Sequence, residues 1–348
     1  MGWQDFQDDY NQPDTRWHKG PLNLLTDVPG ITVGHQTVRL GKVQTGVTVI
    51  QPATGNVFRE KLPAAMHVIN GFGKSTGFMQ VEELGTLETP IVLTNTLAVG
   101  TAYQALVRRL LAENPEIGIS TGTVNPIVME CNDGQINAIR TLSVTEETIQ
   151  QAFAACTETF AEGAVGAGTG MCCYDLKGGI GSASRQITFD GQTFTMGALV
   201  LSNFGSLEDL VINHRAIGKE LKKVIQAEKK VEKGSIITIL ATDLPLDVRQ
   251  LKRLAKRTSV GITRTGSFIG NGSGEVSFAF STANRVAHFA ESAWSMRTVL
   301  AENLMDDCFR MTVSVVEEAV VSSLMHAQST CDIHGKTVYS LSDALARL

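Results

Sequence analysis

Short runs of β-branched and apolar residues alternate with longer stretches of helical periodicity through the first two thirds of the chain. Because turn residues bound them, the short runs predict strands at residues 43–51, 64–69, 91–96, 184–188 and 193–201. Apolar residues at helical spacing predict helices at residues 98–113 and 146–160. We expect the first helix to end before Asn114-Pro115 and the second to begin at Thr145 as its N-cap.

The last third of the chain begins abruptly with the run Ser-Ile-Ile-Thr-Ile-Leu-Ala-Thr at residues 235–242. This run is nearly all β-branched or apolar, which predicts a buried strand. Residues 246–257 and 303–325 predict helices, and residues 275–281 predict another strand. The mixture predicts an α+β protein in which helices pack on sheets. Since no internal repeat or low-complexity linker divides the chain, we expect one domain over residues 1–348.

The composition is that of a folded protein, because 43% of the 348 residues are hydrophobic and 19% are charged. The net charge of −5 argues against a nucleic-acid partner, which usually requires a clustered basic face. One stretch, residues 215–233, is rich in lysine and arginine but also contains three glutamates. Its apolar residues lie at helical spacing, so it predicts an exposed amphipathic helix rather than a binding surface.

The N-terminal residues do not combine a basic segment with an apolar core, so we expect no secretory signal. No apolar run approaches the ~18–20 residues that a membrane span requires, and a cytoplasmic location is expected by default. Six cysteines in a chain of this length do not resemble a disulfide framework, and they lack the spacing of metal ligands. Cys331 and His334 are expected to lie in a turn. We therefore expect neither a metal nor an organic cofactor.

Two glycine-rich stretches resemble nucleotide-binding loops only in part. The stretch at residues 71–75 has Val68 where a Walker A loop requires its first glycine. The stretch at residues 163–170 follows a predicted helix, whereas a dinucleotide-binding fingerprint follows a strand. We expect this second stretch to provide tight backbone packing beside a site.

The pair Gly234-Ser235 stands at the threshold of the buried strand predicted for residues 235–242. An N-terminal nucleophile requires a serine, threonine or cysteine whose upstream peptide can be removed. Its own α-amine, which titrates near pH ~8, then becomes a local base. A preceding glycine allows the scissile backbone to adopt strained conformations without a Cβ clash. By itself a Gly-Ser pair before a strand is common, so its neighbourhood decides the interpretation.

Residues 233–246, Lys-Gly-Ser-Ile-Ile-Thr-Ile-Leu-Ala-Thr-Asp-Leu-Pro-Leu, resemble the autocleavage segment of the L-aminopeptidase D-Ala-esterase/amidase family, which includes the β-peptidyl aminopeptidases. Further segments resemble the same family in order along nearly the whole chain. They are Asp-Val-Pro-Gly-Ile-Thr-Val-Gly-His (27–35), Asn-Gly-Phe-Gly (70–73), Leu-Thr-Asn-Thr-Leu-Ala-Val-Gly (93–100), Glu-Cys-Asn-Asp-Gly (130–134), Gly-Ala-Gly-Thr-Gly-Met (166–171), Lys-Gly-Gly-Ile-Gly (177–181) and Ser-Asn-Phe-Gly (202–205).

The resemblance implies that Ser235 is the nucleophile and forms an acyl-enzyme. It implies Ser273 and Glu275 as partners, and residues two apart on an extended segment point to the same side. Ser273 is expected to relay or hold the Ser235 proton, and Glu275 to orient it or to pair with the freed α-ammonium. Asn203 matches an asparagine whose amide stabilises the oxyanion, an effect worth a factor of about 10²–10³ in rate.

The segment at residues 130–134 is expected to shape the substrate pocket. Some relatives carry an aromatic residue where this chain has Asn132, so the resemblance does not imply a tyrosine contribution to the oxyanion site here. Glu130 or Asp133 is expected to bind the substrate's ammonium group, with a structural turn carboxylate as the alternative for each. The histidines His35 and His67 are expected to be packed or surface residues rather than bases.

By resemblance, the fold is a four-layer αββα sandwich of the N-terminal-nucleophile-hydrolase type. Cleavage between Gly234 and Ser235 would produce an α chain of residues 1–234 and a β chain of residues 235–348. The resemblance also implies a homotetramer of such heterodimers and hydrolysis of N-terminal residues from short peptides, amides or esters. Two alternatives stay open. One is an acyltransferase resembling the ornithine acetyltransferases, which use threonine as the nucleophile, and the other is a non-catalytic scaffold that retains the fold.

Overall fold

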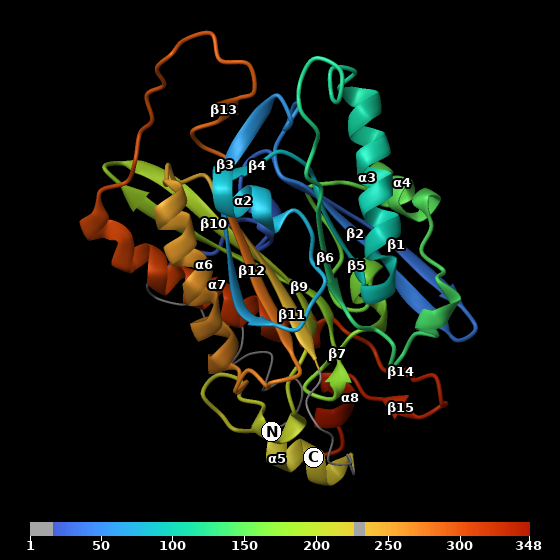
Figure 1. Ribbon diagram of the computed structural model, residues 1–348. Helices are drawn as coiled ribbons and strands as arrows, with labels where there is room; N and C mark the ends of the chain where they lie inside the picture. The colour runs from blue at the N-terminus through green and yellow to red at the C-terminus, as the bar shows by residue number, and fades with distance from the viewer. Residues whose placement is uncertain (1–16, 226–233) are drawn as a thin grey trace.

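Two β-sheets lie face to face at the centre of the molecule, and helices cover their outer faces (Figure 1). The computed structural model describes residues 17–225 and 234–348. The smaller sheet has the strand order β1-β2-β5-β6. Its strands are β1 (Thr32–Leu40), β2 (Val43–Gln51), β5 (Ile91–Asn95) and β6 (Ile127–Cys131). β5 and β6 are parallel, so both end at the same edge of this sheet.

The larger, seven-stranded sheet contains the strand that begins at Ser235. Its order is β13-β3-β12-β11-β10-β9, and β4 pairs with β3. The strands are β3 (Glu60–Gly71), β4 (Thr86–Leu87), β9 (Gly179–Phe189), β10 (Gln192–Asn203), β11 (Ser235–Thr242), β12 (Gly274–Ser281) and β13 (Val286–Ala287). All eight residues of β11 are buried, because β11 lies between β10 and β12 and both its faces are covered. This position explains its nearly continuous apolar sequence.

Helices form the two outer layers. α3 (Val99–Glu113) and α4 (Glu146–Ala154) pack on the smaller sheet, whereas α6 (Val248–Arg264) and α7 (Met305–Met325) pack on the larger one. α6 begins at a capping box in which Asp247 accepts from the N–H of Gln250, and the Gln250 side chain accepts from the N–H of Asp247. The shorter elements include the helices α2 (Phe78–Leu84), α5 (Gly218–Val224) and α8 (Leu341–Leu345). Two hairpins pair β7 (Cys172–Cys173) with β8 (Leu176–Lys177) and β14 (Thr330–Cys331) with β15 (Thr337–Val338).

Separate apolar clusters fill the spaces between the layers. Met129 of the smaller sheet and Ile237 and Phe278 of the larger sheet belong to the cluster between the sheets. Ile236 belongs instead to the cluster formed with α6 and α7. Neighbouring residues of β11 therefore face opposite layers, and burying one isoleucine side chain contributes about 1.5–3 kcal/mol. The predicted αββα layering is confirmed.

The element predictions differ from the structure where tertiary pairing intervenes. The strands at residues 43–51 and 235–242 are confirmed to the residue. The helix predicted at residues 146–160 is wrong beyond Ala154, because Thr157 and Val33 exchange backbone hydrogen bonds of 3.0 and 3.1 Å. In the basic stretch, the structure has a helix only at Gly218–Val224. The remainder of that stretch beyond residue 225 and the N-terminal residues 1–16 lie outside the described residues.

Candidate active site

Ser235 is the first residue of β11 and lies between two neighbouring strands. It pairs with Asn203 of β10 on one side and with Gly274 of β12 on the other. Its hydroxyl donates a hydrogen bond of 2.7 Å to the carbonyl oxygen of Gly234. The residue is buried. This contact places a serine hydroxyl beside the carbonyl of the peptide bond that precedes it, as a self-cleavage reaction requires.

The carbonyl oxygen of Gly234 has a second donor. The backbone N–H of Gly274 donates to it at 3.1 Å. The Ser235 hydroxyl gives up its proton when it attacks the carbonyl carbon, so of these two donors the Gly274 N–H is the one that can stabilise the negative charge developing on the oxygen. Residue 274 must be small, because a Cβ added to Gly274 would lie 3.2 Å from Ser235 Oγ and 2.6 Å from the carbonyl oxygen of Phe72.

Gly234 is required for a different reason from the one that its sequence position suggested. Its φ does not lie in the left-handed region, so no strained backbone demands a glycine. A Cβ at this position would instead lie 2.3 Å from the carbonyl oxygen of Asn203 and 2.5 Å from the Cα of Phe204. Glycine is present because the chain approaches the end of β10 too closely for any side chain.

Replacing Gly234 with alanine should slow self-cleavage about ten- to a hundredfold, since overpacking of this kind costs about 1–3 kcal/mol. Residue 234 leaves Ser235 on cleavage, so the fraction that is processed should keep wild-type specific activity. A time course of intact masses, with hydrolysis normalised to the processed fraction, measures both quantities. Gly100→Ala is the matched control, because a Cβ there meets no atom within 4 Å. Processing of Gly234→Ala at the wild-type rate would contradict the steric argument.

Asn203 presents its amide on the same face of the sheet as the Ser235 side chain, because the two residues are directly paired across antiparallel strands. Its Oδ1 accepts from the N–H of Cys172 at 2.8 Å, and its Nδ2 donates to the carbonyl of Asn132 at 3.0 Å. Among the described residues Asn132 is the one acceptor for this amide, so one of its two N–H groups is available to a ligand. Asn132 thus contributes to the site through its backbone, while its side chain accepts from the N–H of Gly134.

Ser273 and Glu275 flank Gly274 at the start of β12, and both are fully buried. Ser273 Oγ has no hydrogen-bond partner among the described residues. Leaving a buried hydroxyl unsatisfied costs about 1–3 kcal/mol, and such groups are characteristic of functional sites. The side chain of Asn70 binds the carbonyls of Ser273 and Gly270, which fixes the loop that leads into β12.

Strand alternation places Glu275 on the opposite face of the sheet from the Ser235 hydroxyl. Glu275 lies two residues before Ser277, whose hydroxyl contacts Thr258 of α6. Ser235 alternates instead with Ile237, which faces the smaller sheet. The main-chain nitrogen of Ser235 lies between these faces, at the end of the strand. The Glu275 carboxylate, on the helix side of the sheet, can therefore approach the main-chain nitrogen of Ser235 rather than its hydroxyl.

Glu130 is buried at the end of β6 and holds a loop beside Ser235. One carboxylate oxygen accepts from the N–H of Lys74 at 2.9 Å, and the other accepts from the hydroxyl of Thr96. The loop between β3 and α2 that contains Lys74 also contains Phe72, whose carbonyl approaches Gly274. This loop therefore contacts Glu130 and also approaches Gly274, the residue paired with Ser235.

Asp133 is also buried, and its carboxylate faces the protein interior. It accepts from the hydroxyl of Thr45 at 2.5 Å and from the side chain of Asn137 at 3.0 Å. Burial raises the pKa of Asp133 to about 6. These contacts favour a role in anchoring the end of β6 over contact with a substrate.

Several other sequence features have structural explanations. His35 is held by Thr48 at 2.8 Å and by the carbonyl of Ala161 at 3.0 Å, and burial lowers its pKa to about 4, so it is packed as predicted. Residues 163–170 pack backbone against backbone as predicted, since a Cβ at Gly168 would lie 2.5 Å from the nitrogen of Ile180. The chain also has two Gly-x-Ser-x-Gly stretches, at residues 73–77 and 118–122. Both lie in loops rather than in a tight strand-to-helix turn, which a nucleophile elbow requires.

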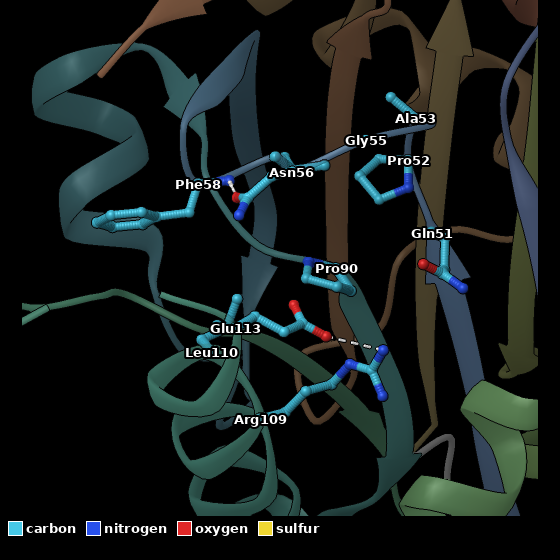
Figure 2. Close-up of a pocket in the computed structure, with 11 residues that line it drawn as sticks. Gln51, Pro52, Ala53, Gly55, Asn56, Phe58, Pro90, Arg109, Leu110 and Glu113 are labelled. Atoms are coloured by element: carbon cyan, nitrogen blue, oxygen red, sulfur yellow. Dashed lines mark hydrogen bonds and ion pairs between the residues drawn. The ribbon is translucent and has the colours of Figure 1, made fainter. Parts of the chain in front are cut away.

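A surface pocket of about 400 Å³ lies away from this cluster (Figure 2). It is lined by the loop after β2, by Pro90 and by the end of α3, where Arg109 and Glu113 form an ion pair of 2.9 Å. Pro90 precedes β5, whereas the Ser235 cluster lies beside Cys131 at the far end of the parallel strand β6. The pocket is therefore separate from the candidate active site.

The αββα sandwich is similar to solved structures over nearly the whole chain. The structure of L-aminopeptidase D-Ala-esterase/amidase from Ochrobactrum anthropi superposes with a TM-score of 0.88 at 34% identity, covering 97% of this chain and 96% of that one. That protein is described as a prototype for the serine aminopeptidases and as a variant of the Ntn hydrolase fold. The PH0078 protein from Pyrococcus horikoshii OT3 superposes with a TM-score of 0.92 at 44% identity, covering 100% of this chain and 98% of that one. The fold is therefore that of the Ntn hydrolases.

The sequence comparisons give the family. The family model for peptidase family S58 matches residues 23–338. Beta-peptidyl aminopeptidase BapA of Sphingosinicella xenopeptidilytica is 34% identical over an alignment 352 residues long, gaps included. The alignment covers 94% of this chain and 87% of that protein. The chain belongs to peptidase family S58, and its function is that of a serine aminopeptidase. None of the helices in the described part of the chain combines the length and hydropathy of a membrane span.

Proposed function

We propose that this peptidase cleaves itself between Gly234 and Ser235 and then uses Ser235 as an N-terminal nucleophile. It would release N-terminal residues from short peptides, amides or esters through an acyl-enzyme. The observation that carries the proposal is the position of the Gly234 carbonyl, which accepts from both the Ser235 hydroxyl and the Gly274 N–H. No metal or organic cofactor is part of the proposed chemistry.

The proposed self-cleavage uses both contacts of the Gly234 carbonyl. Ser235 Oγ attacks the carbonyl carbon, and the Gly274 N–H stabilises the oxyanion. Breaking the C–N bond and passing the Oγ proton to the Ser235 nitrogen leaves an ester between Gly234 and Ser235 Oγ. Water hydrolyses this ester to a carboxylate on residue 234 and a free hydroxyl and α-amine on residue 235.

In the mature enzyme the same hydroxyl attacks the substrate carbonyl. The remaining N–H of Asn203 donates to the oxyanion, and such a donor is worth about 10²–10³ in rate. The leaving amine or alcohol takes the proton, and water then hydrolyses the acyl-enzyme. Ser273 and Glu275 hold and orient the α-amine of Ser235, which is the local base in this scheme.

An aminopeptidase must also recognise the free amino group of its substrate. Glu130 is the better of the two predicted carboxylates for this role, because its loop borders Ser235 while Asp133 faces Thr45 and Asn137. The relatives named above are a β-peptidyl aminopeptidase and an L-aminopeptidase D-Ala-esterase/amidase. We propose a substrate with a free amino group near the scissile carbonyl. A homotetramer of processed heterodimers and a cytoplasmic location stay predictions.

The intact mass of the freshly purified protein under denaturing conditions tests the proposal. We expect two chains, of which the smaller begins Ser-Ile-Ile-Thr at residue 235. A single chain that stays intact on prolonged incubation would contradict self-cleavage and favour a scaffold. Comparing hydrolysis with aminolysis of one activated ester then separates a peptidase from an acyltransferase, because only a transferase would direct most of the acyl group to an added amine.

A further inference from the structure

Lys177 is a fully buried lysine close to the oxyanion site. It lies on β8, directly paired with Cys172 of β7 in a short hairpin. Tyr174 and Asp175 form the turn of this hairpin with φ of 52° and 57°, values typical of a type I′ turn. Figure 1 shows β7 beside the end of the larger sheet where β11 begins.

The ammonium of Lys177 binds backbone carbonyls. Its Nζ donates to the carbonyls of Met171 and Gly178, each at 2.7 Å, and to that of Gly168 at 3.1 Å. Lysine is rarely fully buried unless its charge has partners, because desolvating an ammonium is costly. An apolar side chain would leave these three carbonyl oxygens without this donor, so the ammonium itself, and not packing alone, explains a lysine here.

The Met171–Cys172 peptide links Lys177 to Asn203. The carbonyl of this peptide, on Met171, accepts from the Lys177 ammonium at 2.7 Å, and its N–H, on Cys172, donates to Asn203 Oδ1 at 2.8 Å. A cation on the carbonyl of an amide makes its N–H a stronger donor, since hydrogen bonds in a chain polarise one another. The hydrogen bond from Cys172 polarises the side-chain amide of Asn203 in the same way, which makes the N–H groups on its Nδ2 stronger donors.

We propose that Lys177 is a positioning residue of the oxyanion site: its ammonium holds and polarises the Met171–Cys172 peptide, which fixes the Asn203 amide with an N–H toward the substrate. The inference rests on the proposed function, in which Asn203 is the oxyanion donor. The inference also predicts that self-cleavage and substrate hydrolysis, the two reactions of Ser235, respond differently to substitution of Lys177. Self-cleavage uses the Gly274 N–H on the Gly234 carbonyl, so Lys177 and Asn203 serve substrate hydrolysis and not self-cleavage.

A double-mutant cycle of Lys177→Met and Asn203→Ala tests the link. The substrate is the best hydrolysed of the L-alanyl, D-alanyl and β-alanyl p-nitroanilides, and rates are normalised to the processed fraction. We expect Asn203→Ala to lower kcat about 10²–10³-fold. Lys177→Met should lower kcat about tenfold, the worth of one hydrogen bond, with KM nearly unchanged. The double variant should match Asn203→Ala alone, and both single variants should self-cleave at the wild-type rate.

Three results would overturn the proposal: an unchanged kcat in Lys177→Met, an equal loss in the wild-type and Asn203→Ala backgrounds, or self-cleavage that slows in parallel with hydrolysis. Lys177→Gln, which retains a donor, replaces the methionine variant if thermal unfolding shows that the latter does not fold. Lys61→Met is the matched control, because it removes a mostly buried ammonium paired with Glu88 at the opposite end of β3. A wild-type protein that stays uncleaved and inactive refutes the proposed function itself, so the two failures are distinguishable.

The pH dependence of kcat provides a test without any change at Lys177. Burial lowers the pKa of Lys177 to about 8, and the charged or titratable groups that influence it are Cys172, Cys173, Arg39 and Asp133. The ammonium is lost as the pH rises through this value, so wild-type kcat should fall there. An α-amine acting as a base gives the opposite slope. The α-amine acts in both proteins, so its contribution cancels in the ratio of wild-type kcat to Asn203→Ala kcat. This ratio should fall as the pH rises through about 8, and a ratio that does not change with pH would contradict the proposal.

Discussion

Replacing Ser235 with alanine leaves one chain of 348 residues that neither cleaves itself nor hydrolyses aminoacyl p-nitroanilides. Both reactions are lost because both need the same hydroxyl, which contacts the Gly234 carbonyl at 2.7 Å in the uncleaved chain. Loss of a nucleophile typically lowers kcat by about 10⁴–10⁶. Intact mass and hydrolysis rate, measured on the same preparation, check the two parts of the prediction together.

The control for this variant is Ser259→Ala, which removes a half-buried serine on α6 whose hydroxyl donates to the carbonyl of Lys256. It should process and hydrolyse as the wild type does. Unfolding midpoints of both variants should lie close to that of the wild type. A Ser235→Ala protein that is nevertheless processed and active would refute the assignment of Ser235 as the nucleophile.

Replacing Glu275 with glutamine should lower hydrolysis by about 10²–10⁴, the range expected for a group that manages a proton. The carboxylate is fully buried on β12, the strand parallel to β11, and it lies on the face opposite the Ser235 hydroxyl. From that face it can pair with the α-ammonium of processed Ser235, whereas a neutral amide cannot compensate a charge. The measurement is kcat/KM of the processed fraction, together with the half-life of self-cleavage.

Glu88→Gln is the comparison variant, since Glu88 is a buried carboxylate paired with Lys61 far from the site. It should change stability without lowering kcat. If Glu275→Gln reduced activity no more than Glu88→Gln does, Glu275 would have a structural role and the α-amine would depend on Ser273 or on solvent.

In the proposed mechanism, the two reactions of Ser235 use different donors for their oxyanions. The Gly274 N–H already binds the carbonyl of the scissile peptide, whereas the Asn203 amide faces the same side as the Ser235 hydroxyl and retains an N–H. In this mechanism the Gly274 N–H would serve self-cleavage, which happens once in each chain. The Asn203 amide would serve substrate hydrolysis, which is repeated.

Much of the secondary structure could be predicted from local pattern. Alternation and β-branched content located β2 and β11 to the residue, and helical spacing located α3 and α7 within two residues of their starts. The pattern missed β1 and β6, and it extended α4 too far, because Thr157 pairs with Val33 in a distant part of the chain. Pairing between segments competes with local propensity and leaves no periodic signal of its own.

Only part of the candidate site could be predicted from the sequence. Motif resemblance named Ser235, Ser273, Glu275 and Asn203. The structure places three of them on adjacent strands and Ser273 directly before β12. It did not show that Glu275 lies across the sheet from the hydroxyl, or that Asp133 is held by Thr45 and Asn137. Lys177 stood within a quoted motif, yet nothing in its neighbours along the chain indicated a buried ammonium.

By itself, the sequence determined that a buried strand begins at Ser235 after a glycine, and that the chain resembles a family of self-cleaving serine peptidases. Only the tertiary structure decided which donor reaches the Gly234 carbonyl, why residue 234 must lack a side chain, and which peptide connects Lys177 to Asn203. The physical reason is sheet register. Which side chains share a face depends on how strands distant in sequence are paired, and that pairing is determined by the packing of the whole core.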